Sequence, residues 1–138
     1  MPNDYLESYC REILACNPSI RFAGIANQLG SLIATQYREG LVPLMTKEET
    51  SQYSIQAVLR AATREDFESK IGRLEYSIGK YEKLIRATVP IIFSGSEGKR
   101  FYLLLSFDAD SDAKLIIDKK VLPHLSKNKE NFIQWSSS

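Results

Sequence analysis

Three side chains in this sequence could act as a nucleophile or a general base: Cys10, Cys16 and His124. A cysteine thiolate attacks electrophiles, and a histidine exchanges protons near neutral pH. The cysteines share one predicted helix, where their spacing corresponds to about 600° of rotation, so the thiols point to different sides and no disulfide is expected. His124 is the only histidine and follows Pro123 near a predicted helix end, which favours a surface or capping role. Catalysis would need these groups to meet in a cleft, and we expect no catalytic residue.

Alternating carboxylates between Asp108 and Asp112 have the spacing that opens a calcium-binding loop. Such a loop needs a glycine at its sixth position and a bidentate glutamate at its twelfth. Ala113 and Lys119 hold those positions here, so calcium binding is not predicted. The carboxylates are predicted instead to cap the following helix and to interact with its positive N-terminal end.

The segment from Gly95 to Arg100 contains a Gly-Lys pair like that of a phosphate-binding loop. That loop requires four residues between its glycines and a serine or threonine after the lysine. Here two residues separate the glycines and an arginine follows the lysine, which is typical of a hairpin loop with exposed basic residues. The sequence therefore predicts no cofactor and no metal site.

The overall charge also excludes several partner classes. The formal net charge is +1 and 25% of the residues are charged, so the composition favours neither nucleic acid nor an anionic membrane. The last predicted helix carries four lysines that are interpreted as solvated: Lys119, Lys120, Lys127 and Lys129. Nucleic-acid binding would need aromatic or arginine side chains among them. No apolar run approaches the roughly 18 residues of a membrane span. We expect a soluble, cytoplasmic protein.

The first third of the chain predicts a helix followed by a hairpin. The helix ends before Pro18. Residues 20–26 and 31–37 are rich in β-branched and aromatic side chains and are separated by a turn that contains Gly30, which predicts two paired strands. Gly24 lies within the first strand, where it indicates a bulge or a close backbone approach. A helix packed tightly over the sheet explains this glycine better than a ligand does.

A Thr-x-x-Glu capping box at Thr46 opens a helix that is predicted to reach Lys70. Residues 63–66 could form a second cap, which would divide the segment into two helices; one helix is favoured. Within it, Arg64 and Glu68 would form an ion pair one helical turn apart.

Three strands follow the middle helix, at residues 73–80, 83–93 and 100–107. The second of these alternates between an apolar and a mixed face, and the third is apolar almost throughout. The pattern of the third strand is typical of a central strand with both faces covered. Pro90 has no N–H to donate, so it requires a bulge, a strand end or a sheet edge.

The C-terminal region predicts a last helix over residues 113–125 that Pro123 kinks or ends. Residues 126–138 are interpreted as a partly ordered tail. Its apolar side chains are expected to dock on the domain, and they are Phe132, Ile133 and Trp135.

The predicted order of elements, α-β-β-α-β-β-β-α, resembles the roadblock/LC7 domain and, more loosely, the profilin-like group that includes PAS, GAF and longin modules. Phe22–Ala26 and Gly30–Ala34 are similar to the roadblock opening hairpin, in which an apolar strand turns through a glycine into a second strand. The resemblance covers nearly all of residues 1–138 as a single domain. The sequence is also similar to small archaeal proteins.

This resemblance implies an α+β fold with one five-stranded antiparallel sheet, the middle helix on one face and the terminal helices on the other. It also implies a homodimer formed through the middle helix and the third strand, and an edge strand with an apolar face does need such cover. The candidate interface residues on these elements are Tyr53, Ile55, Val58, Leu59, Ala62, Tyr76 and Ile78. The function implied is a non-enzymatic interaction or regulatory module, with a small GTPase-like protein as a candidate partner.

A small-molecule sensor of the PAS or profilin-like type is the alternative. Gly24, the aromatic residues of the strands and the apolar loop Leu41–Met45 suggest it. This hypothesis predicts a sizeable enclosed pocket between the sheet and the middle helix, lined by a few converging polar groups.

Overall fold

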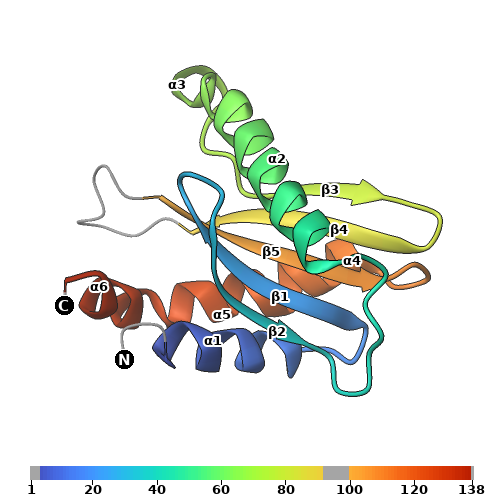
Figure 1. Ribbon diagram of the computed structural model, residues 1–138. Coiled ribbons are helices and arrows are strands. Elements are labelled where there is room, and N and C mark those ends of the chain that lie inside the picture. Colours follow the sequence, from blue (N-terminus) through green and yellow to red (C-terminus); the bar gives the residue numbers. More distant parts are fainter. Residues whose placement is uncertain (1–3, 92–99, 138) are drawn as a thin grey trace.

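An antiparallel sheet of five strands separates two layers of helices (Figure 1). The computed structural model describes residues 4–91 and 100–137. The strand order is β2-β1-β5-β4-β3, and the strands are β1 (Ile20–Asn27), β2 (Leu32–Tyr37), β3 (Ser77–Lys80), β4 (Leu84–Ile91) and β5 (Phe101–Asp108). The helical elements are α1 (Asp4–Leu14), α2 (Lys47–Glu65), α3 (Glu68–Ile71), α4 (Ala113–Ile116), the π-helical turn η1 (Ile117–Val121), α5 (Leu122–Lys127) and α6 (Lys129–Ser137). The predicted fold class is confirmed.

Strand β5 lies at the centre of the sheet, between β1 and β4. Leu103, Leu105 and Phe107 point into the core on the side of the terminal helices, and Tyr102 and Leu104 point to the side of α2. The prediction that both faces of this strand are covered is therefore correct. Each such fully buried side chain contributes about 1.5–3 kcal/mol relative to an exposed one, which makes this strand the anchor of both layers. Residues 92–99, which include the Gly-Lys loop, lie outside the described residues.

The terminal helices form one layer, on the side of the sheet opposite α2 (Figure 1). In α1 the buried residues follow the i, i+3, i+4, i+7 spacing of a helix that covers a flat surface, and they are Leu6, Tyr9, Cys10 and Ile13. The C-terminal region adds Ile117, Val121 and Phe132 to the same core. Phe132 lies in α6, and Trp135 of that helix packs edge-on against Phe101 with ring centroids 5.2 Å apart.

Pro123 does not end the last helix, because a wider helical turn precedes it. The N–H of Leu122 donates to the carbonyl of Ile117, five residues earlier, within η1. Pro123 then occupies the first turn of α5, where a missing N–H is tolerated. A π-type turn is a known way to absorb a local disturbance within a helix.

The middle helix is divided, so the favoured prediction of one helix to Lys70 is wrong. The capping box at Thr46 is present as predicted, with the Glu49 N–H donating to the threonine hydroxyl over 3.1 Å. Helix α2 ends at Glu65, whose carboxylate accepts from Tyr102 and Arg100 near the start of β5. These contacts fix the end of α2 to the sheet, and the chain then turns into the short helix α3.

The third predicted strand is shorter than expected, since β3 begins at Ser77. The residues before it bond through side chains rather than through a strand ladder: the Leu74 N–H donates to Glu68, and the Tyr76 hydroxyl donates to Asp118 over 2.8 Å. Pro90 is paired with Tyr102 of β5, but β3 pairs with β4 only as far as Thr88. Its other side is therefore a local edge of the sheet, which is one of the three positions predicted.

Gly24 is explained by its own strand and not by a helix. A side-chain carbon at this position would lie 2.7 Å from the ring of Phe22 and 3.1 Å from Leu32. The close approach predicted for this glycine is therefore correct, but the neighbour expected to cause it is wrong. Within the part of the chain that the structure describes, no helix is long and apolar enough to cross a membrane.

Candidate functional site

The most exposed apolar surface on a long element is the outer side of α2. Ile55 is 53% exposed and Leu59 is 66% exposed, and both lie on one side of the helix with Ala62. The inner side of α2 carries smaller residues, which are Ser54, Ala57, Val58 and Ala61. The larger aliphatic side chains of this helix thus face outward, which is the reverse of the usual arrangement on a surface helix.

The inner side of α2 carries small side chains because the side chains of the sheet beneath it are bulky. Phe22, Tyr102 and Leu104 fill the space under the helix and pack against Ala57, Val58 and Ala61. Small residues allow the helix backbone to come close to these side chains. The Ser54 hydroxyl also donates to the Gly30 carbonyl over 2.7 Å, which fixes the β1–β2 turn against the middle of α2.

Strand β3 lies beside this helix at the end of the sheet. It is four residues long, and Ile78 is 39% exposed on it. Beyond α2, Phe67 and the α3 residue Ile71 are also exposed, the second at 82%. An open groove of about 570 Å³ runs between the end of α2, α3 and the segment that leads into β3. Ile78 is paired with Ala87, whose side chain lies in the core under the terminal helices, so Ile78 points to that side of the sheet and not to the side of α2. We use "α2 face" for the surface formed by Ile55, Leu59 and Ala62.

The structure brings together three of the seven residues predicted for an interface, those of the α2 face, and it places Ile78 on the other side of the sheet. Val58 is 3% exposed and belongs to the core beneath α2, so its assignment to an interface is wrong. Tyr53 is half-buried against the sheet, and Tyr76 is directed to Asp118 of η1 in the opposite layer. The sequence could not separate Val58 from Leu59, because both continue the helical spacing from Ile55.

Tyr53 has a second role that the sequence did not indicate, since its ring contacts two arginines. The guanidinium carbon of Arg86 lies 3.6 Å from the centre of the ring, and that of Arg60 lies 5.9 Å from it. Guanidinium groups at such distances are attracted by the electrons of an aromatic face. The predicted pair between Arg64 and Glu68 is not formed: Glu68 instead contacts Arg100 at 3.8 Å and accepts from the Leu74 N–H.

The potential nucleophiles lie in the opposite layer. Burial raises the pKa of the Cys10 thiol to about 12, and burial also raises the pKa of Cys16. His124 bridges two residues of α1: its Nδ1 lies 2.9 Å from the Tyr9 hydroxyl, and its Nε2 lies 3.3 Å from a carboxylate oxygen of Glu12. These contacts join α5 to α1. The raised pKa of each thiol favours its protonated form at neutral pH, whereas the thiolate is the nucleophile.

The carboxylates considered for calcium have separate structural roles. Asp112 accepts the Leu115 N–H at the start of α4, which is the capping role that was predicted. Asp108 accepts from Arg38 over 2.8 Å and lies 3.4 Å from Arg21. The described residues contain no cluster of three or more acidic, histidine or cysteine side chains that could hold a metal ion.

Replacing Asp108 with asparagine is expected to lower the free energy of unfolding at pH 7 by about 1 kcal/mol or less, because the ion pairs are partly exposed. Hydrogen bonds from Arg38 hold the pKa of Asp108 below its usual value. Stabilisation from such a group is present above the unfolded-state pKa of about 3.9 and is lost as the pH falls through the lower folded-state pKa. Urea unfolding at pH 7 and again in acid, below that folded-state pKa, should show the two proteins converging in acid. Asp110→Asn is the matched control, and an equal loss in that variant would contradict the assignment.

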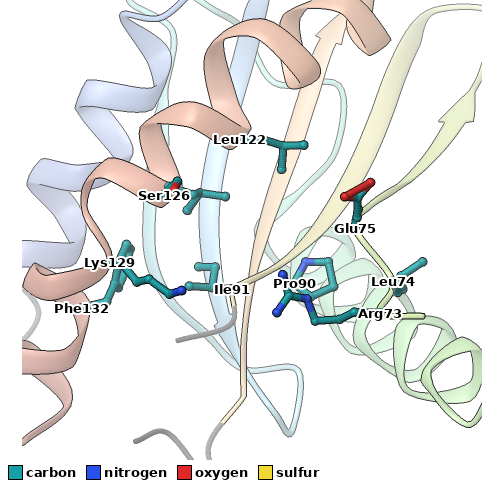
Figure 2. Close-up of a pocket in the computed structure, with 10 residues that line it drawn as sticks. Arg73, Leu74, Glu75, Pro90, Ile91, Leu122, Ser126, Lys129 and Phe132 are labelled. Carbon is teal, nitrogen blue, oxygen red and sulfur yellow. The ribbon is translucent and has the colours of Figure 1, made fainter. Parts of the chain in front are cut away.

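The sensor hypothesis predicts a sizeable enclosed pocket between the sheet and α2, and the pocket found there does not support it. The hollow between the sheet, α2 and the loop Leu41–Met45 has a volume of about 50 Å³, which is far below the roughly 300 Å³ of a small ligand site. A second pocket, of about 210 Å³, lies between the end of β4 and the C-terminal helices (Figure 2). Its wall is apolar at Pro90, Ile91 and Leu122, and it also includes charged side chains such as Glu75.

Comparisons with known proteins identify the fold. No protein-family model and no curated protein matches the sequence. Among solved structures, a roadblock/LC7 domain from Streptomyces avermitilis superposes with a TM-score of 0.67 at 8% identity, over 92% of this chain and 97% of that one. The gliding protein MglB from Thermus thermophilus gives 0.69 at 15% identity, over 99% and 91% of the two chains. A structure of MglB with a tetrameric arrangement gives 0.70 at 16% identity, over 99% and 90%. These values establish a shared fold.

Proposed function

We propose that this chain, which has the roadblock/LC7 fold, is a non-enzymatic homodimeric module that scaffolds or regulates a protein partner. One observation carries the proposal: the α2 face presents outward aliphatic side chains, and the sheet ends at the short strand β3. Proteins protect strands in this position by covering, charging or pairing them. Solved structures of the same fold include an MglB with a tetrameric arrangement.

A second copy of the chain is the proposed occupant of the α2 face and of the free edge of β3. A two-fold axis beside β3 would pair this strand with its counterpart and bring the two α2 helices together. In such a contact the same residues face each other from both copies. Leu59 would then be buried between the two helices, together with Ile55 and Ala62.

Light scattering at tens of micromolar is expected to give the mass of a dimer. Leu59→Asp should weaken self-association about 30-fold or more, because a residue at the centre of an interface contributes about 2 kcal/mol or more, while circular dichroism remains unchanged. Leu115→Asp makes the same chemical change on α4, where Leu115 is also exposed, and should remain a dimer.

A monomeric wild-type protein at these concentrations would overturn the proposed dimer. If Leu59→Asp stays folded and dimeric, the dimer forms through another surface.

A small GTPase-like protein is the proposed partner class, on the basis of the roadblock resemblance of the sequence. Pull-down from native lysate with the wild-type chain as bait should recover a nucleotide-binding GTPase, and its recovery should differ between GDP-loaded and GTP-analogue-loaded lysates. If no GTPase is recovered from either the GDP-loaded or the GTP-analogue-loaded lysate, this partner class is rejected. The dimer measurement is independent of that outcome.

A further inference from the structure

Three arginines line one polar pocket between α2 and the strands β3 and β4. Arg60 and Arg64 reach it from α2, and Arg86 reaches it from β4. The pocket has a volume of about 110 Å³, which corresponds to a few water molecules at about 30 Å³ each. Among the residues that the structure describes, no aspartate or glutamate lines it.

Within the described residues, the three guanidinium groups form no ion pair with a carboxylate. Among the ion pairs of residues 4–91 and 100–137, none involves Arg60, Arg64 or Arg86. Glu65 and Glu68, which lie close to Arg64 along the chain, are occupied by Arg100. Three like charges around one small pocket repel each other unless an anion lies between them.

The arginine from β4 is held in place before any anion arrives. Its guanidinium lies over the ring of Tyr53 at 3.6 Å and contacts the sulfur of Met45. Tyr53 also contacts Arg60 at 5.9 Å. Burial raises the pKa of Tyr53, so its hydroxyl stays neutral and does not itself supply the missing negative charge.

The strands add neutral hydrogen-bonding groups and space. Ser77 of β3 is paired with Thr88 of β4, and both residues line the pocket. Gly79 of β3 is paired with Arg86. A side chain at Gly79 would point to the same side of the sheet as Arg86, and its first carbon would lie in ordinary contact with the ring of Tyr81, at 3.7 Å. With glycine at this position, that space beside the pocket is free of a side chain.

We propose that this pocket binds a phosphate group, as free phosphate or as a small phosphomonoester. Guanidinium forks pair with planar carboxylates and with tetrahedral phosphates. A carboxylate has two oxygens for such donors, whereas a phosphate presents three or four around a centre that carries up to two charges. Three arginines and the hydroxyls of Ser77 and Thr88 fit the second geometry. The inference does not depend on the proposed dimer, because every lining residue comes from one chain.

Calorimetric titration of the full chain with sodium phosphate at pH 7, against sodium chloride at equal ionic strength, tests the proposal. One phosphate is expected to bind per chain, and chloride is expected to give no saturable heat. Arg64→Gln should weaken phosphate binding about tenfold or more, since hydrogen bonds to charged groups are among the stronger ones. Arg64 has no ion pair within the described residues to lose, so the fold of this variant should be intact. Lys47→Gln removes the same charge at the other end of α2 and should bind as the wild type does.

Glycerol 3-phosphate forms the second arm of the titration. Tighter binding than inorganic phosphate would identify a phosphomonoester as the ligand class, and weaker binding would identify free phosphate. The same titrations on Leu59→Asp show whether self-association covers the pocket. If phosphate binds to this variant and not to the wild type, the site is supported and is covered in the dimer. Absence of saturable phosphate binding in both proteins would overturn the proposal, as would equal affinity in Arg64→Gln and the wild type.

Discussion

Val58→Asp is expected to unfold the protein or to lower its free energy of unfolding by about 4 kcal/mol or more. Val58 is 3% exposed beneath α2, where its neighbours include Phe22, Tyr102 and Leu104. A carboxylate at this position would be buried without a partner, and such a charge is strongly destabilising. Urea unfolding followed by circular dichroism measures the loss.

Two further substitutions separate burial from charge. Val58→Ala removes two methyl groups without adding a polar atom and should destabilise by about 2 kcal/mol. Leu59→Asp adds the same carboxylate at the next residue, but on the exposed side, and should change the stability of the isolated chain by about 0.5 kcal/mol or less. Equal destabilisation by the two aspartates would show that α2 is rotated relative to this structure.

Gly30→Ala is expected to lower the free energy of unfolding by about 2–4 kcal/mol, for two reasons that add. The residue has a φ of +86°, which side chains disfavour, and a side-chain carbon would lie 2.6 Å from the Cα of Ile55. The turn cannot move away easily, because Ser54 holds the Gly30 carbonyl at 2.7 Å. Thermal and urea unfolding both measure this change.

Gly40→Ala is the matched control for this variant. Gly40 has a φ of +77°, and no atom lies within 4 Å of the position that its side chain would occupy. Only the conformational part of the penalty applies, about 1–2 kcal/mol. If Gly30→Ala is no more destabilising than Gly40→Ala, the contact between the β1–β2 turn and α2 is not tight in solution.

The strands of the sheet could be predicted because alternate residues of a strand point to opposite faces, so a strand with one buried face shows alternating apolar residues. In β4 the predicted dry face carries Ile85, Ala87, Val89 and Ile91, and all four lie in the core under the terminal helices. The unbroken apolar run of β5 likewise indicated cover on both faces. Local chemistry also identified the capping box at Thr46, since both of its hydrogen bonds form within four residues.

The candidate site was predicted only in part. Its elements, α2 and β3, followed from the roadblock resemblance. Ile55, Leu59 and Ala62 lie together on the exposed side of α2, whereas Ile78 points to the other side of the sheet. The errors arose where long-range contacts decide the outcome. The end of α2 depends on bonds between Glu65 and the start of β5, and the arginine pocket joins α2 to a strand that follows it much later in the chain. No pattern in a single segment contains that information.

The sequence by itself determined the order of elements and the coverage of the central strands, because these depend on periodicity and on turn residues that act over a few positions. Tertiary structure decided which side of α2 faces the sheet. Sequence spacing treats Val58 and Leu59 alike, but the bulky side chains of β1 and β5 accept only small neighbours. The helix therefore turns its alanines inward and leaves Leu59 on the surface. The same packing sets Arg60 and Arg64 above Arg86, at a pocket that exists only once α2 lies across the strands.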